Sequence, residues 1–189
     1  GDMFKMMNRQ LFGNDSTQSL SKENFLAGFF AALDDKALAS VDSASMYVNT
    51  KAEEIRTKAI EAQYADYKKE NEAFLAENKS KEGVKTTASG LQYKVITEGK
   101  GEVPTAESRV KVNYKGTLID GTEFDAREGM TFSAGHVIKG WTEALTMMPV
   151  GSKWELYVPQ ELAYGSSATG KIKPFSTLIF EIELLEIEK

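Results

Sequence analysis

Residues 136–142 read HVIKGWT: two β-branched residues, a lysine and a glycine precede a tryptophan where a helix is predicted to begin. A helix that starts here and packs on a sheet would place Trp141 at the bottom of the space between them. Val137 and Ile138 would form one wall of that space, and Gly140 would let the backbone pass close to its neighbour. The stretch therefore predicts an aromatic site whose floor is the first turn of a helix.

The sequence on both sides of this stretch alternates between apolar and polar residues, as half-buried strands do. Four runs show the pattern: LQYKVI (91–96), VKVNYKGTL (110–118), KWELYV (153–158) and TLIFEIELLEI (177–187). Asp120–Gly121 is a strong hairpin signal, because glycine adopts the positive φ of a type I′ turn without strain. With one short helix at 139–147, this half is predicted to be α+β, a curved antiparallel sheet wrapped on a helix.

The first half of the chain has a different character, dense in charged residues and alanine. Gly1, Gly13 and Gly28 are its only glycines before Gly83, and all four prolines come later. The run from about residue 43 to residue 78 therefore predicts one long, solvated stalk helix of about 50 Å. An antiparallel helix pair is the alternative, although the glycine or proline that a turn favours is missing.

Two apolar segments near the start of the chain, MFKMM (3–7) and FLAGFF (25–30), read as parts of short helices. Their apolar faces are larger than the neighbouring chain can cover, so we expect residues 1–42 to form a homodimer interface. The sequence thus predicts three parts: an all-α dimerisation region (1–82), a linker (83–90) and an α+β domain (91–189).

Composition excludes several classes of function. The chain has no cysteine and one histidine, His136, which excludes disulfides, cysteine nucleophiles and His-rich or thiolate metal sites. The net charge is −5 and no stretch is strongly basic, which argues against a nucleic-acid partner. No apolar run reaches the roughly 18 residues that cross a bilayer. We therefore expect no metal and no cofactor.

Aromatic residues of the second half are predicted to converge on the site around Trp141. A concave aromatic pocket that is open at one end is typical of small-ligand sites. The alternative is that each of these residues belongs only to the core. The pocket would be lined by Tyr114, Phe124, Phe132, Val137, Ile138, Trp141 and Tyr164.

Three segments resemble successive signatures of the FKBP-type peptidyl-prolyl cis/trans isomerases. They are VNYKGTLIDGTEFDA (112–126), VIKGWTEALTMMPVGSKWELYVPQELAYG (137–165) and TLIFEIELLEI (177–187). The resemblance runs from about Gly90 to Glu188. Residues 44–98 are similar to the stalk and linker of a bacterial two-domain branch typified by the macrophage infectivity potentiator, whose helical N-terminal regions dimerise.

Carried over by position, the resemblance implies a prolyl pocket. Trp141 would lie beneath the proline ring, while the Ile138 N–H and the Tyr164 hydroxyl would donate hydrogen bonds to carbonyls of the bound chain. Asp125 would pair with Tyr114 near the substrate carbonyl; a purely structural carboxylate is the alternative. The catalytic residues would be Tyr114, Phe124, Asp125 and Tyr164, and the substrate-binding residues Phe132, Val137, Ile138, Trp141, Ile172 and Phe180.

Two segments depart from the family pattern. AREGMTF (126–132) is shorter than usual and puts Met130 where relatives carry a further pocket aromatic. IKPF (172–175) has Lys173 and Phe175 in place of a proline and a polar residue. Both changes are expected to affect substrate contacts at the rim more than the floor. His136, just before the pocket wall, is expected to be a surface residue.

The resemblance implies an isomerase that accelerates Xaa–Pro rotation in unfolded or proline-containing polypeptides by binding the twisted amide, without a cofactor. It also implies a homodimer through the N-terminal helices, a rapamycin-type macrolide as a ligand, chaperone activity, and a periplasmic or outer-membrane-attached location in a bacterium, with the signal absent from this chain. Two alternatives are open. One is a holdase chaperone or proline-peptide-binding module with weak or no turnover, and the other is a scaffold protein whose pocket residues are only core.

Overall fold

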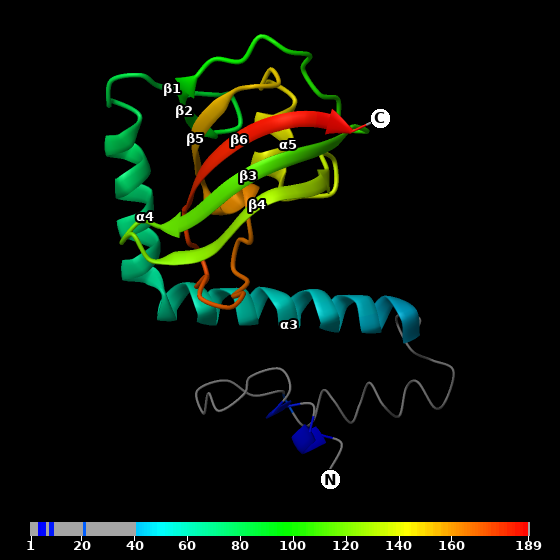
Figure 1. Cartoon of the computed structure of the whole chain (residues 1–189). Helices are drawn as coiled ribbons and strands as arrows, with labels where there is room; N and C mark the ends of the chain where they lie inside the picture. The colour runs from blue at the N-terminus through cyan, green and yellow to red at the C-terminus, as the bar shows by residue number, and fades with distance from the viewer. Residues whose placement is uncertain (1–3, 7, 10–20, 22–40, 189) are drawn as a thin grey trace. The chain divides into compact units, whose positions relative to one another are not determined.

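The computed structural model of the chain describes residues 4–6, 8, 9, 21 and 41–188 (Figure 1). The chain divides into two compact units, residues 1–63 and 64–189. The homodimer interface expected over residues 1–42 falls almost entirely outside the described residues. Within the described residues, no helix combines the length and the apolar composition that crossing a bilayer requires.

Helix α3 (Val41–Gln63) is the main described element of the first unit. Its sequence is rich in alanine and charged residues, which favour a helix even without tertiary packing. Most of its described side chains are exposed, and Glu53 and Arg56 lie 3.9 Å apart as an i,i+3 ion pair. The polar, solvated helix expected in this region is present over these residues.

The prediction of a single helix over about residues 43–78 is wrong in the middle of that range. Tyr64 has φ −109° and ψ 17°, outside the helical range, and a second helix, α4 (Ala65–Asn78), begins after it. Neither glycine nor proline marks this break. Helix α4 belongs to the second unit and buries Asn71 and Asn78 there, so tertiary packing rather than local sequence decides where the first helix ends.

The predicted linker over residues 83–90 is also structured. It contains strand β1 (Val84–Thr86), which pairs antiparallel with β2 (Gln92–Thr97). With α4 and β1 included, the second unit begins at residue 64 rather than at residue 91.

The second unit is built on a six-stranded antiparallel sheet with the strand order β1-β2-β5-β6-β3-β4 (Figure 1). The remaining elements are β3 (Arg109–Leu118), β4 (Glu123–Ser133), α5 (Lys139–Leu145), β5 (Lys153–Val158), the 3-10 turn η1 (Gln160–Leu162) and β6 (Leu178–Glu188). All four predicted strands are found within a few residues of their expected bounds. The predicted α+β class is therefore confirmed.

The hairpin predicted at Asp120–Gly121 joins β3 to β4, but its turn differs from the expected type I′. Only Gly121 has a positive φ, 83°, and its N–H donates to the Leu118 carbonyl at 2.9 Å. The Leu118 N–H in turn donates to the Thr122 carbonyl at 2.9 Å. A turn closed by one left-handed glycine is the pattern of the longer hairpin loops, and it needs no positive φ at Asp120.

Helix α5 packs on the concave face of the sheet and closes the core. Trp141, Ala144 and Leu145 are buried on its inner side. Gly140 is needed at the contact with β5, because a Cβ there would lie 2.5 Å from Val158 Cγ1. The close approach expected for this glycine is present, and it brings Trp141 into the concave space of the sheet.

Candidate active site

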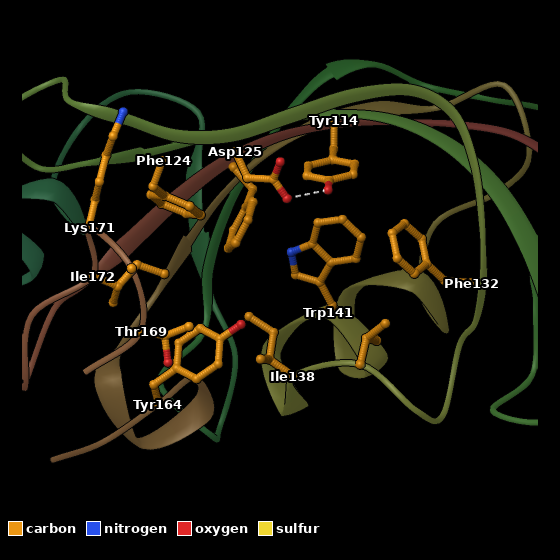
Figure 2. Close-up of a pocket in the computed structure, with 13 residues that line it drawn as sticks. Tyr114, Phe124, Asp125, Phe132, Ile138, Trp141, Tyr164, Thr169, Lys171 and Ile172 are labelled. Carbon is orange, nitrogen blue, oxygen red and sulfur yellow. Dashed lines mark hydrogen bonds between the residues drawn. The ribbon is translucent and has the colours of Figure 1, made fainter. Parts of the chain in front are cut away.

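The space between α5 and the strands β3, β4 and β6 is an open pocket of about 370 Å³ (Figure 2). Its lining includes all ten residues that the sequence analysis singled out, which are Tyr114, Phe124, Asp125, Phe132, Val137, Ile138, Trp141, Tyr164, Ile172 and Phe180. It also includes Thr169, Gly170 and Lys171, which the sequence analysis missed. The only signal for these three was their position next to Ile172 in the chain.

Trp141 is the floor of the pocket and is only 4% exposed. Its indole meets the rings of Tyr114, Phe132 and Phe180 at centroid distances of 5.1, 5.6 and 5.1 Å, each at an angle above 80°. Edge-to-face contact is a preferred arrangement, because the positive edge of one ring meets the negative face of the next. Three such contacts hold the indole in one orientation.

Two N–H groups at the start of α5 have no hydrogen-bond partner among the described residues. The buried Trp141 Nε1 has no hydrogen-bond partner within the described part of the chain, and in Figure 2 it points toward the open middle of the pocket. The Ile138 N–H is likewise without a backbone or side-chain acceptor among the described residues. Ile138 precedes the first turn with φ −59° and ψ 149°, and no side chain caps the helix. Such N–H groups can donate hydrogen bonds to carbonyl oxygens of a bound chain.

Asp125 and Tyr114 form the polar side of the pocket. The Tyr114 hydroxyl donates to Asp125 Oδ2 at 2.5 Å (Figure 2). Arg127 Nε lies 3.6 Å from Asp125 Oδ1. Burial of the phenol, and then the hydrogen bond to the carboxylate, raise the pKa of Tyr114 to about 12. The phenol is therefore a fixed donor that holds the Asp125 carboxylate in place at neutral pH.

The pKa of Tyr114 gives a testable pH dependence. Since it is raised from 10.0 to about 12, the folded protein holds this proton more tightly than the unfolded chain does. The resulting stabilisation should be complete below about pH 10 and should be lost as the pH rises from about 10 to about 12. Tyrosinate absorbance titrations of the protein and of Tyr114→Phe should differ by one group that titrates near the upper end of this range. If the group that distinguishes the two titrations had an ordinary tyrosine pKa, the raised pKa of Tyr114 would be contradicted.

Phe124 and Lys171 shape the mouth of the pocket. Phe124 packs edge-on against Phe180 at 5.5 Å and lies over Gly116, where a Cβ would come within 2.5 Å of the Phe124 ring. Glycine at residue 116 is therefore required for this ring position. Lys171 Nζ donates to the Glu123 carbonyl at 2.9 Å, which ties the loop before β6 to the start of β4.

The altered residues of the two departures from the family pattern do not line the pocket. Met130 is 40% exposed on β4, where it pairs with Val112, and it does not line the pocket. Lys173 and Phe175 do not line it either: Lys173 Nζ lies 5.1 Å from the Tyr67 ring centre, and Phe175 is 3% exposed. Lys173 and Phe175 therefore pack toward α4, and none of the three residues belongs to the pocket lining.

His136 is exposed, and its Nδ1 lies 3.0 Å from Ser133 Oγ, as expected of a surface residue. It is not among the residues around the pocket. In the part of the chain that the structure describes, no group of three or more His, Asp or Glu side chains is placed to hold a metal ion.

A curved antiparallel sheet, a short helix and an aromatic pocket between them define an FKBP-like domain. Residues 100–185 match the sequence model of the FKBP-type peptidyl-prolyl cis-trans isomerases, and residues 3–95 match that of the domain amino-terminal to this isomerase. The chain therefore belongs to the family of FKBP-type peptidyl-prolyl cis-trans isomerases. The family and the enzyme class predicted from the sequence are confirmed.

Individual relatives agree with this assignment. The chain is 46% identical over 187 residues to the FKBP-type 22 kDa peptidyl-prolyl cis-trans isomerase of Escherichia coli, covering 94% of this chain and 89% of that protein. It is 51% identical over 127 residues to the outer membrane protein MIP of Legionella longbeachae, covering 65% of this chain but only 54% of the relative. The crystal structure of FkpA from Escherichia coli matches with a TM-score of 0.66 at 34% identity, covering 99% of this chain and 88% of that one.

Proposed function

We propose that the pocket over Trp141 accelerates cis–trans rotation about Xaa–Pro bonds in unfolded polypeptides. The observation that carries the proposal is the indole floor, enclosed by aromatic rings and bordered by the Ile138 N–H, which has no acceptor among the described residues. A proline ring is apolar and of a size that such a floor can accept, while the amide before it needs donors for its neighbouring carbonyls. The pocket supplies both in one place.

The chemistry requires no nucleophile. Rotation about a peptide bond meets a barrier of about 18–20 kcal/mol because amide resonance must be broken. Uncatalysed exchange about Xaa–Pro takes about 10–100 s. No bond is made or cut, so catalysis means binding the twisted amide more tightly than either planar form. A million-fold acceleration would correspond to a barrier lowered by roughly 8 kcal/mol.

Four parts of the pocket would share this task. Trp141 would hold the proline ring while the carbonyl before it swings through the twisted state. The apolar walls favour that state, because the planar amide has the larger charge separation and is less well solvated there. The Ile138 N–H and the Tyr164 hydroxyl would anchor carbonyls of the bound chain. Asp125, oriented by Tyr114, would act electrostatically on the rotating carbonyl.

The test is NMR exchange spectroscopy on a short Xaa–Pro peptide with catalytic amounts of the protein, repeated with a rapamycin-type macrolide. We expect exchange to become much faster than the uncatalysed 10–100 s, and the macrolide to block it. Acceleration without blocking would support the isomerase and reject the macrolide as a ligand. No acceleration would contradict the proposed activity and favour a holdase that binds chains without turnover.

Holding of unfolded chains is a second candidate function. It is favoured by the first unit, residues 1–63, which falls largely within the matched amino-terminal domain and which bond rotation itself does not require. We include in this proposal a homodimer formed through the N-terminal helices and a location in the bacterial envelope. A relative that is named an outer membrane protein supports this location. Light scattering at micromolar concentration tests the dimer, and a monomer there would reject it.

A further inference from the structure

The loop that follows the pocket residue Ile172 is attached to helix α4. Asn71, only 2% exposed, accepts a hydrogen bond on Oδ1 from the Thr177 N–H at 2.7 Å. Its Nδ2 donates to the Tyr67 carbonyl at 2.8 Å. Both partners are backbone groups of fixed polarity, so only one orientation of the Asn71 amide satisfies them. The side chain thus links the helix to the start of β6.

A second link runs through Tyr67. Its hydroxyl lies 3.1 Å from Ser176 Oγ, and Ser176 Oγ donates to the Lys173 carbonyl at 2.8 Å. Since the single Ser176 hydroxyl proton is used on Lys173, Tyr67 must be the donor in the first bond. This chain of hydrogen bonds ends one residue after Ile172.

The third link is the packing of Phe175, which is 3% exposed. Its φ of 63° lies in the left-handed region, which is costly for a non-glycine residue and persists only where the surroundings hold it. Lys68 Nζ from α4 lies 5.1 Å from the centre of the Phe175 ring. The Phe175 N–H donates to the Gly165 carbonyl at 2.8 Å, directly after the pocket residue Tyr164.

Through these three links α4 holds the chain next to two pocket residues. Ile172 precedes Lys173, and Tyr164 precedes Gly165, which is bonded to Phe175. In Figure 2 both lie on the same side of the pocket, with Thr169 between them and across from Phe132. Ile172 is further tied to Thr169 by two backbone hydrogen bonds of 2.9 Å. The rim segment, residues 164–177, is thus bound to α4 at its C-terminal end, and Lys171 ties it to the start of β4.

We propose that α4 positions this rim segment for substrate, with Asn71 and Tyr67 as its positioning residues. The inference rests on the proposed function and deepens it, because it makes residues 64–78 a working part of the isomerase site. Neither residue touches the pocket, so their effect would pass through Ile172 and Tyr164. A loosened rim should weaken the binding of planar and twisted peptide alike, which raises KM and leaves kcat nearly unchanged.

The test compares two buried asparagines of the same helix. Asn71→Leu removes the link to Thr177, whereas Asn78→Leu removes a bond from Asn78 Nδ2 to Gln92 Oε1 (3.0 Å), on β2 and outside the pocket lining. For an Xaa–Pro peptide we expect Asn71→Leu to raise KM about fivefold with kcat changed less than about twofold. Asn78→Leu should leave KM unchanged. The methyl resonance of Ile172 should move in Asn71→Leu and stay in place in the control.

Tyr67→Phe is the milder companion variant, because it removes one hydroxyl and keeps the ring. It should shift the Ile172 methyl resonance and raise KM by a smaller factor. Unchanged KM and an unmoved Ile172 resonance in both α4 variants would overturn the inference, and so would an equal rise of KM in Asn78→Leu. If the unaltered protein fails to accelerate exchange, the proposed function is rejected, while the Ile172 resonance still decides whether α4 holds the rim.

Discussion

Replacing Trp141 with alanine is expected to lower the free energy of unfolding by about 3–5 kcal/mol and to remove isomerisation. The side chain is 4% exposed, and its indole contacts the edges or faces of three other aromatic rings. The loss combines the transfer free energy of a large ring with a cavity that the rigid sheet cannot close. Denaturant unfolding followed by circular dichroism measures the stability change, and NMR exchange on an Xaa–Pro peptide measures the rate.

The chain offers a matched control in its second tryptophan. Trp154 is 6% exposed and stacks on Tyr93 at 4.6 Å, but it does not line the pocket. Trp154→Ala should destabilise the protein by a similar amount and keep the isomerisation rate under conditions where the variant is folded. Trp141→Leu is expected to fold more readily than Trp141→Ala, so it separates the loss of stability from the loss of isomerisation. A folded Trp141→Leu with an unchanged rate would show that the indole is core only.

The second large effect is expected at the mouth of the pocket. Phe124→Ala should lower kcat/KM about 100-fold, equivalent to about 2.7 kcal/mol of transition-state stabilisation. Phe124 is only half-buried and contacts Phe180 from one side, so the stability loss should be smaller than for a fully buried ring, about 1–2 kcal/mol. The same NMR exchange experiment gives the rate, and thermal or denaturant unfolding gives the stability.

Phe124→Ala also separates the two candidate functions. If isomerisation is lost while suppression of aggregation is unchanged, the two activities belong to different surfaces. If both are lost together, the pocket itself holds the unfolded chains. Tyr93→Ala is the control, because Tyr93 is a half-buried aromatic on β2 outside the pocket lining. An isomerisation rate in Phe124→Ala equal to that of this control would remove Phe124 from the site.

The elements that the sequence predicted well are those whose signal is local. Two-residue alternation identified β3 and β6, and the Asp120–Gly121 pair identified the hairpin that brings Phe124 and Asp125 next to β3. The pocket residues were predicted because they lie on these elements and within motifs of a recognisable family. The type of the turn was not predicted, because it depends on how many loop residues connect the two twisted strands.

The elements that the sequence missed depend on partners far along the chain. Nothing near Tyr64 predicts an interrupted helix. Helix α4 beyond the break packs within the second unit, where Asn71 bonds to Thr177 more than a hundred residues away. The packing of Lys173 and Phe175 toward α4 was missed in the same way, since their partners Tyr67 and Lys68 lie about a hundred residues earlier in the chain. The residue type limits the contacts that a side chain can make, whereas its neighbours in space decide which of those contacts it makes.

The sequence by itself determined the α+β class, the family and the ten residues around the pocket, since strand alternation, turn residues and motif spacing are all properties of short segments. Only the tertiary structure decided that the unit begins at α4, that Thr169, Gly170 and Lys171 complete the pocket, and that Asn71 holds its rim. Those features are contacts between distant segments. Their free energy arises from burial and from hydrogen bonds that exist only once the chain has folded.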